Sequence, residues 1–254
     1  MTVDVIRAVS LGQLPHGFLG RRGGVSTGAI SGLNVGYGSG DDRDSIAANR
    51  RLAIEAIMSG AELATVHQVH SAEAVHASNA WPQDQRPRAD GMVTDRPGLL
   101  LGILTADCAP VLLADHHAVV VGAAHAGWRG ALAGVTDATI AAMEQLGARR
   151  ENIHAAVGPC IAQDSYEVDE AFRARFVADD ADNERFFVAG PGGKPHFDLE
   201  AYVVHRLIAA GVGEVEALNL DTYSDADRFF SFRRATHCGE ADYGRQIALI
   251  GIPG

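Results

Sequence analysis

Cysteine and clustered positive charge are both scarce in this 254-residue chain. Its three cysteines are an odd number at wide spacing, which argues against a disulfide framework and indicates a reducing compartment. Lysine occurs only once, at Lys194, among 21 basic residues, and 32 acidic residues bring the formal charge to −11. Because duplex binding depends on clustered lysine and arginine, this balance argues against nucleic acid as a partner.

Long apolar runs are missing as well. No run approaches the ~20 residues that cross a bilayer, and the first residues lack the basic-then-apolar pattern of a secretory signal. We therefore expect a cytoplasmic protein with no membrane partner. No repeat or composition shift marks a boundary, and 47% hydrophobic content supports a sizeable core, so we expect one domain over residues 1–254.

Two apolar runs inside residues 105–130 predict an antiparallel hairpin. They span 111–114 and 118–124, and the polar break Asp-His-His at 115–117 separates them. A hairpin returns the chain on itself, so the residues that flank its outer ends, Cys108 and His125, come close in space. A thiol beside an imidazole makes either a nucleophile with its base or two metal ligands.

Hydrophobic periodicity predicts the remaining elements. A glycine-rich bend at 126–130 leads into a helix over 131–146 that Gly147 ends. Cys160, beside a Gly-Pro turn, is interpreted as a buried packing residue. Further helices are expected over 41–59, 166–176 and 197–210, and strands over 62–77, 99–104, 153–157, 215–217 and 246–252.

The expected strand at 62–77 carries His67 and His70, and a third metal ligand can come from there. In an extended strand these two side chains face opposite sides, so at most one of them points into a given site. Closely paired ligands typical of a zinc finger are missing, but one cysteine with two histidines is a known catalytic zinc set. The spacing therefore indicates zinc at Cys108 and His125 with one of the two histidines.

A glycine-dense stretch at 18–40 contains Arg21 and Arg22. Its composition is typical of a surface loop that joins short strands. The alternative is an anion-holding loop, in which glycine backbones approach a ligand and an arginine forks onto it. The lysine and spacing of a nucleotide phosphate loop are absent.

Ordered motifs recur along nearly the whole chain: RRGGVS at 21–26, Leu33-Asn34, QVH at 68–70, ADG at 89–91, TADCAP at 105–110, HAGWRG at 125–130, Gly158-Pro159, YEV at 166–168, FDL at 197–199, FSFRR at 230–234 and Gly244-Arg245. With these motifs the chain resembles the YfiH-like family. That family is also described as multicopper polyphenol oxidases (laccase-like) and as purine nucleoside phosphorylases of the LACC1/FAMIN type. Two positions depart from its pattern: Ser71 stands where glycine is usual, and Asp221 where cysteine is frequent.

The resemblance implies an α/β (α+β) fold with mixed β-sheets layered between helices, as in YfiH-like cysteine hydrolases. It implies His70, Cys108 and His125 as the metal or catalytic triad, which selects His70 over His67. Arg21 matches an arginine expected to bind substrate or phosphate, and Arg233 is a second candidate. Asp107, next to Cys108, is expected to orient a ligand histidine or to move a proton.

The resemblance leaves three reactions open. In the first, zinc supports phosphorolysis of adenosine, inosine or methylthioadenosine, and deamination of adenosine, with nucleoside and phosphate as small-molecule partners. In the second, Cys108 is a nucleophile and His125 its base in an amide hydrolase that edits peptidoglycan precursors. In the third, copper oxidises phenols. The close histidine pairs of a multicopper oxidase are absent, so copper is less expected than zinc.

Overall fold

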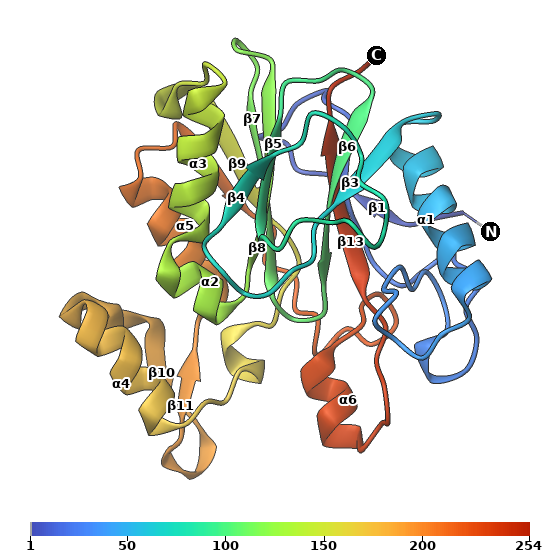
Figure 1. Cartoon of the computed structure of the whole chain (residues 1–254). Coiled ribbons are helices and arrows are strands. Elements are labelled where there is room, and N and C mark those ends of the chain that lie inside the picture. Colours follow the sequence, from blue (N-terminus) through green and yellow to red (C-terminus); the bar gives the residue numbers. More distant parts are fainter. Residues whose placement is uncertain (1) are drawn as a thin grey trace.

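Two mixed β-sheets lie face to face, and helices cover both outer faces in this computed structural model, which describes residues 2–254 (Figure 1). The first sheet has the order β1-β2-β13-β6-β3, with bounds Val5–Ile6, His16–Leu19, Gln246–Gly251, Leu99–Thr105 and Glu62–Thr65. The second has the order β12-β9-β7-β8-β5-β4, with bounds Glu214–Ala217, Ile153–Val157, Ala109–Asp115, Val120–Ala126, Gly91–Thr94 and Ala74–His76. The predicted α/β fold with mixed sheets layered between helices is confirmed.

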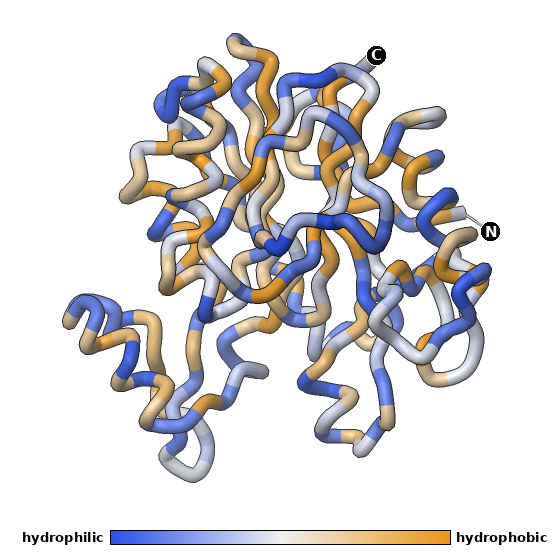
Figure 2. The backbone as a smooth tube through the Cα atoms, viewed as in Figure 1, coloured by the Kyte–Doolittle hydropathy of each residue, from blue (hydrophilic) through white to orange (hydrophobic). Residues whose placement is uncertain are grey.

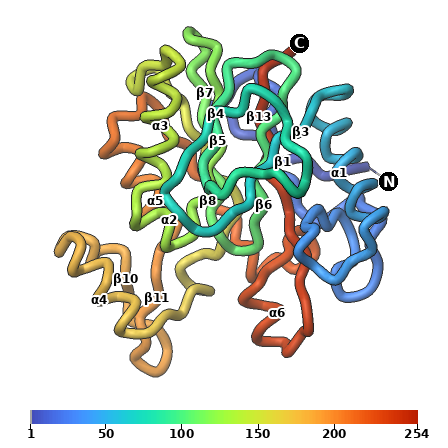
Figure 3. Tube along the Cα trace, viewed as in Figure 1, coloured from blue at the N-terminus to red at the C-terminus, as the bar shows by residue number. Residues whose placement is uncertain are grey.

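Both sheets combine parallel and antiparallel pairs. The parallel pairs are β3 with β6, β4 with β5 and β9 with β12. The last strand, β13, is antiparallel to both β2 and β6 and lies between them, so the C-terminal segment completes a sheet begun by the N-terminal one (Figure 3). The first sheet is therefore complete only when β13 is in place between β2 and β6.

Alternation along the central strands builds the core. In β7, Leu112 and Ala114 face the first sheet while Val111 and Leu113 face the helices, and all four are fully buried. The same two-residue period places apolar side chains of both sheets in one shared layer between them. Figure 2 shows this pattern as hydrophobic stretches along the central strands.

The helices close the two outer faces. Helix α1 (Arg43–Ile57) packs on the first sheet, and α3 (Val135–Gln145) and α5 (Leu199–Ala209) pack on the second. Three further helices and a two-stranded ribbon lie toward one end of the sheets: α2 (Trp128–Ala133), α4 (Glu170–Asp179), α6 (Phe232–Cys238), β10 (Phe187–Ala189) and β11 (Pro195–Phe197). Short 3-10 turns η1 (Gly28–Ile30), η2 (Arg150–Asn152), η3 (Gln163–Ser165), η4 (Ala181–Phe186) and η5 (Pro191–Gly193) connect other elements.

Capping residues set where the helices expected over 41–59 and 197–210 begin, which is at Arg43 and Leu199. The Asp42 side chain accepts a hydrogen bond from the Ser45 N–H at the start of α1, and Asp198 accepts one from the Ala201 N–H at the start of α5. The predicted helix at 166–176 instead begins at Glu170, because Asp169 caps it. Helix α6 was not predicted.

Two predicted elements are wrong in their extent. The single helix expected over 131–146 is divided into α2 and α3 at Gly134, whose φ of 95° is left-handed and interrupts the helical path. The single strand expected over 62–77 ends at Thr65 and resumes at Ala74 in the other sheet. His67 and His70 therefore lie in an irregular crossover, and strand alternation does not govern where they point.

Within residues 2–254, no helix combines the length and apolar character needed to span a membrane.

Candidate metal centre

The hairpin predicted from two apolar runs is confirmed. Strands β7 and β8 pair antiparallel from Ala109 opposite Ala126 to Asp115 opposite Val120, which places His125 opposite Pro110. Cys108 immediately precedes β7 and therefore lies at the same end of the hairpin as His125. Local pairing alone thus brings this thiol and this imidazole together.

A second histidine, His70, completes a cluster with Cys108 and His125, and it comes from a different part of the chain. One ligand atom from each of His70, Cys108 and His125 lies within 4.8 Å of the other two, and His70 Nε2 is 3.8 Å from Cys108 Sγ. His70 lies where the chain crosses from β3 in the first sheet to β4 in the second. Cys108 lies in a later crossing in the same direction, from β6 to β7. The cluster therefore forms where two crossovers between the sheets meet.

The backbone at both crossovers adopts a conformation that side chains disfavour. His70 has a φ of 60° and Asp107, next to Cys108, has a φ of 83°. Such left-handed positions cost of order 1 kcal/mol and persist only where the surroundings hold them. Gln68 helps to stabilise the first crossover. Its side-chain amide donates to the Leu104 carbonyl at 2.7 Å and accepts from the Leu104 N–H at 2.9 Å.

Asp90 also stabilises the backbone of the first crossover, and it links that crossover to His125. Its carboxylate accepts backbone N–H bonds from Val69, His70 and Ser71 at 3.1, 3.0 and 2.7 Å. It also lies 2.8 Å from His125 Nδ1 and is completely buried. Asp90 therefore fixes two ligands of the cluster at once, and His125 keeps Nε2 free to face Cys108.

The charges of the cluster favour a thiolate beside an imidazolium in the absence of metal. Burial opposes ionisation of Cys108, but the adjacent His125 and His70 outweigh it and lower the pKa of the thiol to about 6. Burial likewise opposes a charge on His125, but Cys108 and the bond to Asp90 raise its pKa to about 9. For Asp90, burial is again outweighed by its bonds to His125 and Ser71, and its pKa falls well below its usual range.

These residues fit a zinc ion in donor type, spacing and support. A thiolate and two imidazoles are a known catalytic zinc set. His125 bonds its second ring nitrogen to a carboxylate, as metal-ligating histidines commonly do. Gly127 leaves the space open, because a Cβ there would lie 2.8 Å from Cys108 Sγ and 2.8 Å from His70 Cδ2.

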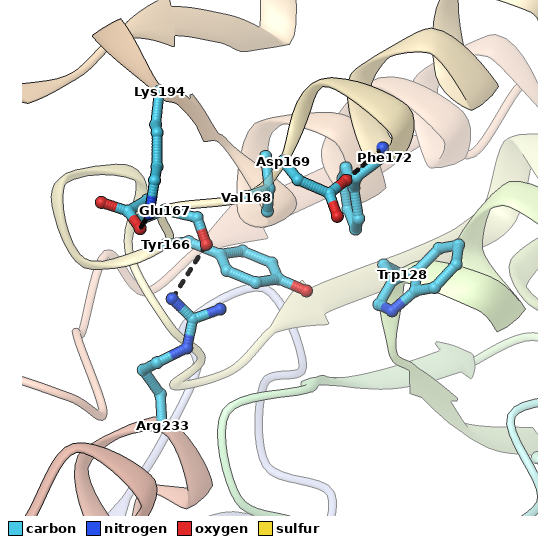
Figure 4. A pocket seen from close by; sticks show the side chains of 8 residues that line it. All are labelled: Trp128, Tyr166, Glu167, Val168, Asp169, Phe172, Lys194 and Arg233. Atoms are coloured by element: carbon cyan, nitrogen blue, oxygen red, sulfur yellow. Dashed lines mark hydrogen bonds and ion pairs between the residues drawn. The ribbon is translucent and has the colours of Figure 1, made fainter. Parts of the chain in front are cut away.

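Cavities adjoin the cluster on two sides, and His70 and Cys108 line both. One has a volume of about 270 Å³ and an aromatic wall formed by Trp128, Tyr166 and Phe232. Trp128, Tyr166 and Arg233 also line an adjoining cavity of about 440 Å³, and Figure 4 shows these three side chains around it.

The other cavity, of about 380 Å³, has a polar wall. Four arginines line it, Arg43, Arg50, Arg86 and Arg245, and we call it the arginine cavity. Its other lining residues are Gly36, Tyr37, Gly38, Val66, His67, Gln68, His70, Gln83, Leu104, Thr105, Ala106, Cys108, His125 and Tyr243. The cluster thus lies between an aromatic space and a cationic one.

The family model described as multi-copper polyphenol oxidoreductase laccase matches residues 15–253. The chain belongs to this family. A Deinococcus radiodurans relative named purine nucleoside phosphorylase is 41% identical over 254 residues, covering 99% of this chain and 94% of that protein. The Escherichia coli K12 relative named purine nucleoside phosphorylase YfiH is 34% identical over 91% of each chain.

Solved structures agree with this membership. A Neisseria meningitidis protein superposes with a TM-score of 0.88 at 33% identity and full coverage of both chains. YlmD from Geobacillus stearothermophilus superposes with a TM-score of 0.88 at 28% identity, covering 100% of this chain and 97% of that one. The YfiH-like family expected from the motifs is therefore confirmed.

The other side chains that the family resemblance indicated lie at varied distances from the cluster. Arg233 lines the aromatic cavity beside Cys108, and its guanidinium donates to the Glu167 carbonyl at 2.9 Å and lies 5.3 Å from the Tyr166 ring centroid. Arg21 lines neither cavity. Its guanidinium donates to the carbonyls of Ser31 and Ala226 and lies over the Phe230 ring, so it is engaged in holding loops together.

Asp107 contacts neither ligand histidine. Its carboxylate accepts from Thr222 Oγ1 at 2.7 Å and from the Arg233 N–H at 2.6 Å, which attaches the start of α6 to the crossover. Burial raises its pKa. The carboxylate that contacts a histidine of the cluster is Asp90 and not Asp107, the residue from which this contact was expected.

Sequence reasoning missed Asp90 as a site residue. The signal available was its place in the ADG motif at the start of a buried strand, β5, but a carboxylate 20 residues from His70 has no local feature that links it to that histidine. The four arginines of the arginine cavity were missed for the same reason, since Arg43 and Arg50 of α1 meet Arg86 and Arg245 from distant parts of the chain.

Proposed function

We propose that this chain is a zinc-dependent purine nucleoside phosphorylase that acts on adenosine, inosine or methylthioadenosine. The observation that carries the proposal is the position of the His70–Cys108–His125 cluster, on a wall shared by an aromatic cavity and an arginine cavity. Phosphorolysis brings together a flat aromatic base, a ribose and a phosphate anion. The names of the relatives from Deinococcus radiodurans and Escherichia coli support the same activity.

His70, Cys108 and His125 would hold the zinc ion, and a fourth position would remain for a substrate or water oxygen. When bound, zinc supplies Lewis-acid polarisation to the group that occupies that position. Asp90 keeps His125 in the tautomer that presents Nε2, and it holds the backbone of the crossover that carries His70.

The aromatic cavity offers the surfaces that a purine requires. The faces of Trp128 and Tyr166 present flat apolar area, and the Arg233 guanidinium adds donors for ring nitrogens or a carbonyl (Figure 4). Burial raises the pKa of Tyr166 well above its usual range, so its hydroxyl stays protonated and can donate to a base.

In the reaction, a phosphate oxygen forms a bond to ribose C1′ as the bond from C1′ to the purine nitrogen breaks. The products are ribose 1-phosphate and the free purine, which gains a proton. Attack and departure occur on opposite faces of C1′, which agrees with ligand spaces on both sides of the cluster. Adenosine deamination, in which water replaces the amino group at C6 and inosine and ammonia are released, is proposed as a second activity that does not use phosphate.

A Cys108 amide hydrolase is the second candidate, because one observation favours it. Asp90, His125 and Cys108 form a carboxylate–imidazole–thiol series in which the pKa of the thiol is lowered to about 6. Zinc on the sulfur would remove this nucleophile. Metal content therefore separates the two candidates.

The deciding experiment is product analysis on a nucleoside panel, with and without phosphate, using protein whose metal content has been measured. We expect about one zinc per chain and ribose 1-phosphate formed only when phosphate is present. His70→Ala should lose both zinc and turnover. His67→Ala is the matched control for zinc retention, because His67 lies in the same crossover but outside the cluster. Zinc retained by His70→Ala would refute the metal assignment, and a metal-free protein inactivated by alkylation of Cys108 would support the hydrolase.

A further inference from the structure

The arginine cavity carries an excess of positive charge that the rest of the chain does not share. Arg43, Arg50, Arg86 and Arg245 all line it, and no aspartate or glutamate does. The whole chain has a formal charge of −11, so carboxylates are plentiful elsewhere. A concave surface with one sign of charge concentrates ions of the opposite sign.

None of these four guanidiniums is neutralised by a carboxylate. Among residues 2–254, ion pairs form around other arginines, such as Arg173 and Arg206, but none includes the four that line this cavity. Unpaired arginines that converge on one space form a natural receptor for an oxyanion, because their planar donors match its oxygens.

Arg50 shows most directly that a ligand is needed. Its Nη2 is the one buried side-chain nitrogen or oxygen that lacks a hydrogen-bond partner within residues 2–254. The same guanidinium is held in place, because Nε donates to the Val35 carbonyl at 2.9 Å. Burial also lowers the pKa of Arg50 to about 10, a desolvation cost that a bound anion would offset. Buried donors of this kind are rarely left unpaired.

The surroundings hold these side chains in place before any ligand binds. The Tyr37 ring lies under two guanidiniums, with centroid distances of 4.6 Å to Arg50 and 5.6 Å to Arg43. Arg86 donates to the carbonyls of Gln83 and Val66. Because these side chains are already ordered in the folded protein, phosphate binding costs little further conformational entropy.

We propose that the arginine cavity is the binding site of the phosphate that attacks the nucleoside, and that Arg50 Nη2 donates to it. The identity of the anion rests on the proposed phosphorylase function, whereas the existence of an anion site rests on the cavity itself. His70 and Cys108 line both this cavity and the aromatic one. Phosphate here and a purine there would approach ribose C1′ from opposite sides. This assignment replaces Arg21 as the principal phosphate ligand.

The test measures phosphate binding directly, by calorimetry, on the zinc-loaded full chain titrated with inorganic phosphate. Arg50→Gln and Arg43→Gln are the test variants, and Arg149→Gln is the control, because Arg149 is exposed and lies outside the cavity. We expect Arg50→Gln to weaken phosphate binding roughly tenfold to a hundredfold. In kinetics the KM for phosphate should rise while the KM for inosine changes less than about threefold. Arg43→Gln, at a more exposed position, should show a smaller effect in the same direction.

An unfolding curve is measured for each variant. If Arg50→Gln does not fold, phosphate binding by Arg43→Gln decides whether the proposal holds. Phosphate affinity equal to wild type in both variants would overturn the proposal, even if the protein cleaves inosine. Dependence on Arg50 seen only with inosine 5′-monophosphate would also overturn it, because the site would then hold the phosphate of a nucleotide. Arg50-dependent phosphate binding without any nucleoside cleavage would support the anion site and refute the phosphorylase function.

Discussion

Single residues decide whether the three ligand atoms can converge. Asp90 contacts both the loop that carries His70 and the ring of His125, so its carboxylate positions two ligands although it is not one itself. Gly127 has the complementary role, because the absence of a side chain leaves room between Cys108 and His70.

Asp90→Asn should weaken zinc binding roughly tenfold to a hundredfold, because the amide cannot accept all the bonds that the carboxylate accepts. Competition with a chromogenic chelator measures this change. Asp95→Asn is the control, because Asp95 is an exposed carboxylate that contacts only the exposed His76. Zinc affinity unchanged in Asp90→Asn would contradict the positioning role.

Gly127→Ala should also lower zinc affinity by roughly tenfold or more, because the new methyl group would displace Cys108 or His70 by several tenths of an ångström. The backbone itself tolerates alanine, since Gly127 has a φ of −68°. Gly38→Ala, which meets no atom within 4 Å, is the matched control. If both variants bind zinc like wild type, the cluster is less confined than the structure shows.

At the scale of elements, the β7–β8 hairpin sets the position of Cys108 relative to His125, and its turn is held by a buried carboxylate. Asp115 accepts backbone N–H bonds from His117 and Ala118 in the turn, and from Arg149 across the sheet. Burial opposes its ionisation, but these three bonds prevail and lower the pKa of Asp115.

This shift gives a pH-dependent prediction for stability. A carboxyl group whose pKa is lower in the folded state stabilises that state above its unfolded pKa of about 4, and this contribution is lost as pH falls through the folded value. Asp115→Ala should therefore reduce the free energy of unfolding by about 1–3 kcal/mol near pH 7. The difference from wild type should shrink below about pH 4. Urea unfolding at several pH values measures it.

The control for this measurement is Asp84→Ala, since Asp84 is exposed. It should leave the unfolding free energy within about 0.5 kcal/mol of wild type. A difference between Asp115→Ala and wild type that stayed constant down to pH 2 would contradict the charge-based account and indicate a purely steric effect.

At the scale of the whole molecule, the cluster joins the two sheets. His70 and Cys108 lie in two of the crossovers between them, from β3 to β4 and from β6 to β7, and His125 lies in β8 of the second sheet. A metal bound to all three would link segments that separate on unfolding, so its binding would contribute directly to global stability.

Zinc at about a hundredfold excess over its Kd should stabilise the wild-type protein by about 2.7 kcal/mol. For a chain of this size, that corresponds to a rise in Tm of about 5–10 °C. A chelator should reverse the rise, and Cys108→Ser should abolish it. Cys238→Ser should retain it, because Cys238 is exposed and lies outside the cluster. A zinc-induced rise of equal size in Cys108→Ser would place the metal elsewhere. Scanning calorimetry measures all three proteins.

The sequence by itself determined the features that depend on neighbours along the chain. The α1 cap at Asp42, the α5 cap at Asp198 and the β7–β8 hairpin follow from local patterns, and the hairpin alone brings Cys108 near His125. The choice of His70 over His67 came from family resemblance, because a strand pattern over 62–77 described a segment that in fact leaves one sheet and enters the other.

Only the tertiary structure decided what depends on the meeting of distant segments. Asp90 reaches both His70 and His125 because two crossovers between sheets meet there, and the four arginines of the arginine cavity come from α1, the segment between β4 and β5, and the segment before β13. Periodicity reports which face of an element is apolar, but it carries no information on which elements will lie opposite each other. That choice is made by packing of the whole core, and the chemistry of the site follows from it.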